Sequence, residues 1–473
     1  MRELVRRNLR FFLIFFAAAL VLRLVFIFRF PGVVTDSFVY GDIAKNWLQH
    51  GIYGLSGTQE ISPTYIRLPG YPAFLALIFS IAGMEHYRAV LFVQMFVDLA
   101  TCFLCADIAL RLISSRAAKA AFVLACLCPF LADYSAAALT ETLEVFFTAL
   151  TFDLVIRGLQ CRSLGYWAGA GAACAAAILL RPDGALLVIA IEIYLLVIAF
   201  TKRKTDCGVT GVSAAFRRDY LLNIVKWGAV LAIVAVLPLI PWTIRNWYTF
   251  HRFQPLAPRY ANEENEFVPM GFNRWVKTWM ADYASVEEIY WQEPGDKIDP
   301  TKLPSRAFDS PEQREQTEAV IEDYNDALHV SPRLDAKFEA LAKARIQSHP
   351  ARYYIGLPIL RIMDMWLRPR TEMLPSDSRW WEFDDEPKWL VLALVFGVVN
   401  LFYVACALVG WMRVRRIELT GLLVLFVVLR SLFLGTLENP EPRYTLEMYP
   451  IVIVFAACAL VQTRFGAEGE KSG

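Results

Sequence analysis

Long apolar blocks recur along this sequence, and they restrict its fold more than any other feature. Of the 473 residues, 56% are hydrophobic, compared with roughly 45–50% in soluble domains. The blocks are about 16–25 residues long, enough to cross about 30 Å of hydrocarbon as α-helix. A soluble helical protein would interrupt such blocks with charge at each turn. The pattern therefore predicts an all-α polytopic membrane protein.

The positions of Lys and Arg indicate which blocks cross the bilayer. Segment 69–84 is apolar but short, and it opens with Pro69, Gly70 and Pro72. If it does not cross, the basic clusters between spans all fall on one side, as the positive-inside rule requires. We therefore predict a re-entrant or interfacial helix over 69–84. Ten spans remain, near 11–30, 88–112, 117–132, 136–157, 164–180, 183–201, 222–241, 388–411, 418–435 and 445–463.

This topology places both termini and the 202–219 loop in the cytoplasm, and segments 31–87 and 242–387 outside. In the second outer segment, 310–348 is predicted to be helical with a break at Ser331-Pro332. Residues 349–367 are predicted to form an interfacial amphipathic helix. The resulting parts are an N-terminal transmembrane module, an extracytoplasmic segment, C-terminal transmembrane helices and a disordered tail, with bounds 1–245, 246–387, 388–465 and 466–473.

Six polar motifs lie at the predicted outer boundary of the membrane. Their distinctive residues are Asp36 with Tyr40, Arg67 before a Pro-Gly turn, Thr140-Glu141, Arg181 in LLRPDG, Arg245 in PWTIRNW, and Arg443-Tyr444. A guanidinium binds phosphate with two hydrogen bonds, and a carboxylate can take a proton from a hydroxyl. Together the motifs predict a site for an anionic headgroup whose lipid tail stays in the bilayer, with a base opposite it.

Four of these motifs also have a purely structural explanation. Asp36 or Thr35 can cap the helix that follows. Arg67 can snorkel to the interface, and Arg181 can close its turn by pairing with Asp183. Glu141 can stabilise a helix N-terminus. Glu144, one turn further along, is an alternative to Glu141 as the working acid, because intramembrane acids are functional candidates.

These motifs resemble those of C-type glycosyltransferases, the GT-C fold enzymes that use polyprenyl-phosphate sugars. The resemblance is to bacterial relatives of dolichyl-phosphate-mannose–protein mannosyltransferases and of the lipid A aminoarabinose transferase. It covers most of 1–245 and the last span, and little of 247–387. It is carried by Asp36 with Tyr40, R-x-P-G-Y-P at 67–72, Thr140-Glu141, L-R-P at 180–182, P-W-x-x-R-N at 241–246, and Arg443-Tyr444 before Pro450.

The resemblance implies an inverting transferase with Asp36 as the general base. It implies that Glu141 orients the acceptor or holds a metal. The arginines of the motifs would grip the carrier phosphate, with the tyrosines as further substrate contacts; these residues are Arg67, Arg181, Arg245, Arg443, Tyr40 and Tyr444. Many relatives have Asp-Glu where this chain has Asp36-Ser37, which weakens the case for a metal. No cofactor is certain, and a divalent cation stays open.

The implied partners are a polyprenyl-phosphate-linked sugar donor, such as one on undecaprenyl phosphate, and membrane lipids. The acceptor can be a lipid, a glycan or a protein of the cell envelope. The implied location is the inner (plasma) membrane, with the active site facing the periplasm or exterior. A net charge of +1 gives no field for nucleic acid. Alternatives are a polysaccharide ligase or polymerase using lipid-linked glycans, a membrane scaffold, or a transporter, which would show repeated halves and broken midplane helices.

Overall fold

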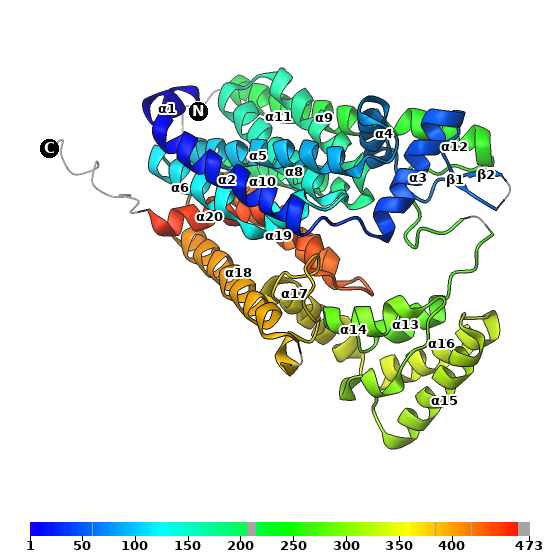
Figure 1. The fold of residues 1–473 in the computed structure, drawn as a ribbon. Helices are drawn as coiled ribbons and strands as arrows, with labels where there is room; N and C mark the ends of the chain where they lie inside the picture. Colours follow the sequence, from blue (N-terminus) through cyan, green and yellow to red (C-terminus); the bar gives the residue numbers. More distant parts are fainter. Residues whose placement is uncertain (59, 206–213, 264, 384, 418, 462–473) are drawn as a thin grey trace. The chain divides into compact units, whose positions relative to one another are not determined.

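The described chain is mainly helical with one short sheet, which confirms the predicted all-α class. The computed structural model describes residues 1–473 apart from 59, 206–213, 264, 384, 418 and 462–473 (Figure 1). For 201–205 and 214–219 the backbone alone is described. Within these residues the one sheet is an antiparallel hairpin of β1 (Gly54–Ser56) and β2 (Ile61–Pro63), in which Leu55 pairs with Ser62. The predicted tail at 466–473 lies outside the described residues.

The chain divides into two compact units, each described here by itself. Unit 1 comprises Met1–Ala261, Phe402–Val427 and Leu446–Gly473, and unit 2 comprises Asn262–Leu401 and Val428–Thr445. The helices of unit 1 are α1 (Arg2–Arg7), α2 (Leu9–Arg29), α3 (Thr35–His50), α4 (Gly70–Ala82), α5 (Tyr87–Leu112), α6 (Ser115–Leu127), α7 (Pro129–Ser135), α8 (Glu141–Cys161), α9 (Leu164–Leu180), α10 (Ala185–Thr205), α11 (Ala214–Val236), α12 (Leu239–Phe250) and α20 (Tyr449–Leu460). Helices α18 (Pro387–Val414) and α19 (Thr420–Gly435) contribute residues to both units.

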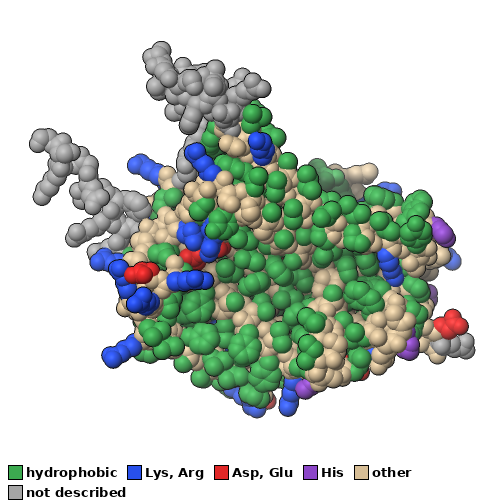
Figure 2. Space-filling view, turned by 90° about the horizontal axis from the view of Figure 1, so that it is seen from above, with side chains coloured by type: hydrophobic (Ala, Val, Ile, Leu, Met, Phe, Trp, Pro, Cys, Tyr) green, Lys and Arg blue, Asp and Glu red, His purple; other side chains and the backbone are tan. Residues whose placement is uncertain are grey.

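Six described helical segments are long and apolar enough to cross a membrane, or up to seven if the bent pair α6–α7 is one span. The six are Leu9–Arg29, Tyr87–Leu112, Pro182–Phe200, Tyr220–Phe250, Pro387–Val414 and Pro442–Leu460. Helices α9 and α19 are apolar but shorter, and α8 carries four charged residues within its length. The count of ten spans therefore stays a prediction. Figure 2 shows hydrophobic side chains covering much of one face, with Lys and Arg gathered toward one end.

Segment 69–84 forms the 13-residue helix α4. At 1.5 Å per residue it is about 20 Å long, shorter than the roughly 30 Å hydrocarbon core. Its first residue, Gly70, lies so close to α9 that an added Cβ would stand 2.5 Å from the Leu179 carbonyl oxygen. The start of α4 is therefore held against the end of α9.

Unit 2 contains α13 (Met270–Lys277), α14 (Tyr283–Glu288), α15 (Pro311–Ala327), α16 (Pro332–Ser348) and α17 (Leu357–Leu367). Its core includes Trp275, Trp279, Tyr324 and Phe338, which are fully buried. The predicted helix over 310–348 and its break at Ser331-Pro332 are confirmed. Both halves start in the same way, because a serine hydroxyl accepts a hydrogen bond from the N–H three residues on and a proline follows.

Residues 349–367 form a π-helical turn, Arg352–Gly356, followed by α17. Two of the charged residues that suggested an interfacial helix, Arg361 and Asp364, make polar contacts within unit 2. Arg361 is fully buried and donates to the carbonyls of Met280 at 2.9 Å and Gly435 at 3.1 Å. Asp364 accepts a 3.0 Å hydrogen bond from the Tyr283 N–H. A position of this helix at a membrane surface stays a prediction.

Candidate active site

Asp36 lies in the first turn of α3 rather than capping it. The N-cap residue is Val34, whose N–H donates to the Ser37 hydroxyl at 3.1 Å. The helix dipole favours a carboxylate at this position. Arg67 Nη2 donates to Asp36 Oδ1 at 3.1 Å, and the Asp36 side chain remains 36% exposed. The carboxylate is therefore ion-paired yet accessible.

Tyr40 lies one turn after Asp36, with the Arg67 guanidinium 5.6 Å from its ring centroid. Burial, with the charges of Arg67, Asp36, Arg181 and Glu141 as smaller influences, raises the pKa of the Tyr40 hydroxyl to about 12. The hydroxyl therefore stays protonated at neutral pH and can donate a hydrogen bond. The same charges show that the structure brings these five sequence-predicted residues into one neighbourhood.

Arg181 lies among three carboxylates. Its Nη1 is 3.9 Å from Glu141 Oε1, and its Nε is 3.8 Å from Glu144 Oε1 and 3.5 Å from Asp183 Oδ1. Glu141 and Glu144 are both buried at the start of α8. The structure thus contains the Arg181–Asp183 pair expected of a simple turn, and adds two acids to it. Neither Glu141 nor Glu144 can be chosen on distance alone.

Two backbone contacts bring these segments together. Gly32 forms a parallel bridge with Ala137, in which Gly32 N donates to Ala136 O at 2.8 Å and Ala138 N donates to Gly32 O at 2.7 Å. Asp36 follows Gly32 by four residues, and Glu141 follows Ala137 by four. The bridge therefore sets the two acid-bearing segments in register, while the contact of Gly70 with Leu179 brings Arg67 toward Arg181.

Gln94 is a residue of this region that sequence reasoning missed. Its side chain is fully buried in α5, where it accepts from the Tyr71 hydroxyl at 2.7 Å and donates to Ala137 O at 2.6 Å. It thereby fixes α4 and the bridge strand to α5. A lone amide inside an apolar span was the available signal, because buried polar groups in membranes need partners.

Asp42, the other aspartate of α3, is engaged by the hairpin. It accepts from Ser56 N at 2.7 Å and Ser56 Oγ at 2.8 Å, and Lys45 Nζ lies 3.2 Å away. Burial opposes ionisation, but the Ser56 hydrogen bonds and the Lys45 ammonium outweigh it and lower the pKa of Asp42. This carboxylate therefore fastens β1 to α3.

Arg245 supports the same hairpin. It donates to Tyr53 O and Thr64 O at 2.7 Å each, and its guanidinium lies 5.2 Å from the Trp242 ring centroid. These contacts hold Arg245 against the hairpin, and the substrate-binding role predicted from the sequence stays a prediction.

Arg443 and Tyr444 lie in unit 2. Arg443 Nε is 2.6 Å from Glu441 Oε2, and the guanidinium lies 5.4 Å from the Tyr444 ring centroid. The Tyr444 hydroxyl donates to Glu441 Oε1 and accepts from Asn439 Nδ2 at 3.1 Å. These two predicted residues form a local cluster around Glu441.

The described residues contain no group of three or more His, Cys, Asp or Glu side chains that could hold a metal ion. The acids nearest to such an arrangement, Glu141, Glu144 and Asp183, surround the Arg181 guanidinium. That cation supplies the countercharge that a metal would, so these residues do not fit a divalent ion.

These features define a helical membrane protein whose candidate site combines carboxylates with arginine guanidiniums. Residues 66–242 match the model of the family described as dolichyl-phosphate-mannose-protein mannosyltransferase. This match confirms the predicted resemblance over that stretch, which contains Arg67, Glu141 and Arg181. Asp36, Arg245 and Arg443 lie outside it. Among curated proteins, none matches the sequence.

Two solved structures are similar to this chain over most of its length. Archaeal oligosaccharyltransferase AglB from Archaeoglobus fulgidus, with an inhibitory peptide and a dolichol-phosphate, has a TM-score of 0.47 and 13% identity over 95% of this chain. The match covers 50% of AglB, so the chain spans about half the length of that protein. ArnT from Cupriavidus metallidurans bound to undecaprenyl phosphate has a TM-score of 0.39 and 15% identity, over 93% of this chain and 77% of that one.

Proposed function

We propose that this chain is an inverting glycosyltransferase that moves a sugar from a polyprenyl-phosphate donor to an acceptor on the extracytoplasmic face of the plasma membrane. The observation that carries the proposal is the cluster of Asp36, Arg67 and Tyr40 beside Arg181 and its acids. The match of residues 66–242 to the mannosyltransferase family supports it.

Arg67 suits the role of a phosphate ligand. One of its donors binds Asp36, but its buried Nε has no hydrogen-bond partner among the described residues. An unsatisfied buried donor costs roughly 1–3 kcal/mol, which a phosphate oxygen would recover. Arg181 is the second cation of the cluster. Fixed cations stabilise the negative charge that grows on the phosphate as it leaves.

Asp36 suits the role of general base. A hydroxyl is a weak nucleophile at neutral pH, so a carboxylate must take its proton as its oxygen attacks the sugar C1. The bond from C1 to the phosphate oxygen breaks on the opposite side, and the configuration at C1 inverts. Asp36 is partly exposed and its ion pair with Arg67 orients it, which suits this step.

Glu144 is the acid we assign to hydroxyl binding. It is buried, and neither of its carboxylate oxygens has a hydrogen-bond partner within the described part of the chain. A carboxylate in that state can accept two hydroxyl hydrogen bonds from a sugar. Glu141 would hold Arg181 in place. This division of roles is our proposal for the two alternatives that the sequence leaves open.

Donor binding tests the proposal directly. Undecaprenyl phosphate should bind the purified full chain, and Arg67→Ala and Arg181→Ala should each weaken binding by about tenfold or more. Arg88→Ala is the matched control, because this exposed arginine starts α5 next to the same region. Equal undecaprenyl phosphate affinity in the unmodified chain and all three variants would contradict the assignment of Arg67 and Arg181 as phosphate ligands. Inversion is tested by NMR of the product anomer formed from a synthetic polyprenyl-phosphate sugar, and retention at C1 would exclude the mechanism.

A further inference from the structure

A small polar pocket lies within unit 2, apart from the residues discussed above. The empty space in and over it, open solvent included, is about 290 Å³, and its lining includes Tyr283 and Glu287 of α14 together with Arg368, Glu372, Ser376 and Ser378 of the segment after α17.

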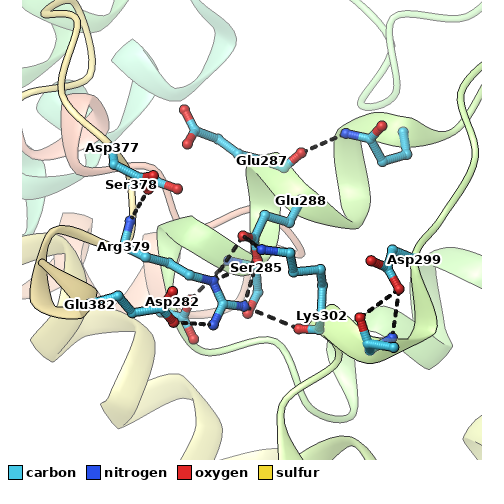
Figure 3. A network of polar contacts seen from close by, with 12 residues as sticks. Asp282, Ser285, Glu287, Glu288, Asp299, Lys302, Asp377, Ser378, Arg379 and Glu382 are labelled. Carbon is cyan, nitrogen blue, oxygen red and sulfur yellow. Dashed lines mark hydrogen bonds and ion pairs between the residues drawn. The ribbon is translucent and has the colours of Figure 1, made fainter. Parts of the chain in front are cut away.

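The pocket is built from firmly held parts. Arg379 Nε donates to Glu288 Oε1 and Oε2 at 2.8 and 2.9 Å, and Arg379 Nη2 donates to Lys302 O at 3.2 Å. Figure 3 shows this network fastening the segment with Ser378 to α14, while the Glu287 carboxylate points away from it. The wall is therefore fixed by Glu288, which leaves Glu287 facing the pocket.

Arg368 carries an unsatisfied buried hydrogen-bond donor in the pocket. Its side chain is only 4% exposed, and its Nη1, although 3.8 Å from Asp364, has no hydrogen-bond partner among the described residues. The guanidinium is held at 5.3 Å from the Tyr283 ring centroid and 5.5 Å from that of Trp381. The buried Ser376 hydroxyl also has no partner in the described chain. A ligand in the pocket could therefore satisfy two buried polar groups, Arg368 Nη1 and the Ser376 hydroxyl.

The charges restrict what that ligand can be. Glu287 and Glu372 are both carboxylates of the lining, and burial, followed by their charges and that of Glu441, raises the pKa of the Tyr283 hydroxyl. A phosphate or carboxylate would meet this negative charge. A cation would leave the Arg368 donor unsatisfied and be repelled by it. A neutral polyol avoids both conflicts, because each hydroxyl accepts from a guanidinium and donates to a carboxylate.

The pocket segment is also tied to the residues around Arg443. Arg370, two residues after Arg368, is fully buried and donates to Pro442 O at 2.8 Å and to the Thr445 hydroxyl. Pro442 immediately precedes Arg443, which the sequence predicts to bind the carrier phosphate. A sugar held in the pocket would therefore be bound by the same unit as that arginine.

We propose that this pocket binds one neutral sugar ring, and that the ring belongs to the acceptor. The claim that the ring belongs to the acceptor rests on the proposed transferase function. The claim that the pocket binds a sugar ring rests on the pocket alone, so the two claims are tested separately.

Sugar binding is tested by saturation-transfer NMR on the full chain, in a zwitterionic detergent without a sugar headgroup. The probes are the methyl glycosides of glucose, mannose, galactose and N-acetylglucosamine. At least one should bind with millimolar affinity. Ser376→Trp should abolish binding by filling the pocket, and Ser305→Trp, at an exposed site of unit 2, should not. Glu287→Gln should weaken glycoside binding by about tenfold. This smaller substitution still tests the pocket if the Ser376→Trp variant does not fold.

Binding of no probe, binding unchanged in Ser376→Trp and Glu287→Gln, or stronger binding of glucose 1-phosphate would each overturn the sugar pocket. In transfer assays, Ser376→Trp should raise the acceptor KM several-fold and leave undecaprenyl phosphate affinity unchanged. An unchanged acceptor KM would overturn the claim that the ring belongs to the acceptor. A chain that binds a glycoside but transfers no sugar from any polyprenyl phosphate would overturn the proposed function and leave the pocket standing.

Discussion

Asp36 and Asp42 lie six residues apart on α3, and their surroundings give them different roles. Asp36 is paired with Arg67 beside Tyr40, whereas Asp42 is hydrogen-bonded to Ser56. Asp36→Asn keeps the shape but cannot take a proton, so transfer to a hydroxyl acceptor should slow by about 10²–10⁴-fold. Initial rates and undecaprenyl phosphate affinity should be measured together. A variant with near-normal rate would show that Asp36 is not the base.

Asp42 should affect stability rather than rate. The Ser56 hydrogen bonds and the Lys45 ammonium lower the pKa of Asp42, so its ionised form stabilises the folded chain above the unfolded pKa. This contribution is lost as pH falls through the lower folded pKa. Asp42→Asn should lower Tm at neutral pH by about 2–4 °C. The gap from wild type should narrow in acid. A Tm difference that stays constant from neutral pH into acid would contradict this stabilising role of the Asp42 carboxylate.

Sequence reasoning identified these residues but not all of the contacts that they make. Asp36, Arg67 and Tyr40 were predicted to meet because membrane topology places them at one boundary. Arg245 was grouped with them for the same reason, yet its acceptors are the carbonyls of Tyr53 and Thr64. Every residue has a backbone carbonyl, so the sequence does not indicate which carbonyls accept from Arg245. These acceptors are identified only from the folded hairpin.

At the scale of elements, the approach of α4 to α9 sets the distance between Arg67 and Arg181. A Cβ on Gly70 would stand 2.5 Å from the Leu179 carbonyl oxygen, and a backbone atom cannot turn away as a side chain does. Gly70→Ala should therefore separate the two arginines and weaken undecaprenyl phosphate binding by about tenfold. Gly165→Ala in α9 is the control, since its new Cβ would meet only Ser163 Oγ at 3.6 Å. Equal affinity in both variants would show that this contact does not shape the site.

Local signals predicted individual elements better than membrane crossings. The break at Ser331-Pro332 was predictable because a capping serine and a proline act within one turn. The status of α8 was not, because Glu141, Glu144, Asp153 and Arg157 make it too polar for a span by composition. Arg157 Nη2 donates to Asp107 Oδ2 of α5 at 2.5 Å, and Arg111 Nε of α5 lies 3.5 Å from Asp153 Oδ1. Pairing between charges on different helices is a tertiary property that hydropathy does not record.

At the scale of the whole molecule, the contact between Gly70 and Leu179 bears on topology. Between these two residues lie α5, the bent pair α6–α7, α8 and α9, an even number of predicted spans. Two points joined by an even number of spans lie on the same side of a membrane. If α4 also crossed, the start of α4 and the end of α9 would lie on opposite sides, contrary to that contact. The parity of the basic clusters in the sequence leads to the same topology.

Cysteine labelling tests this topology in intact cells and in inverted vesicles. The nine native cysteines are first replaced, and single cysteines are then placed at the exposed residues Gly57, Glu85, Thr301 and Ser115. An impermeant maleimide should reach the first three from outside, because α4, at about 20 Å, is too short to separate Gly57 from Glu85. It should reach Ser115 only from the cytoplasmic side, because α5 is 26 residues long. Labelling of Gly57 and Glu85 from opposite sides would mean that α4 crosses, and Arg67 and Arg181 would then not share a phosphate.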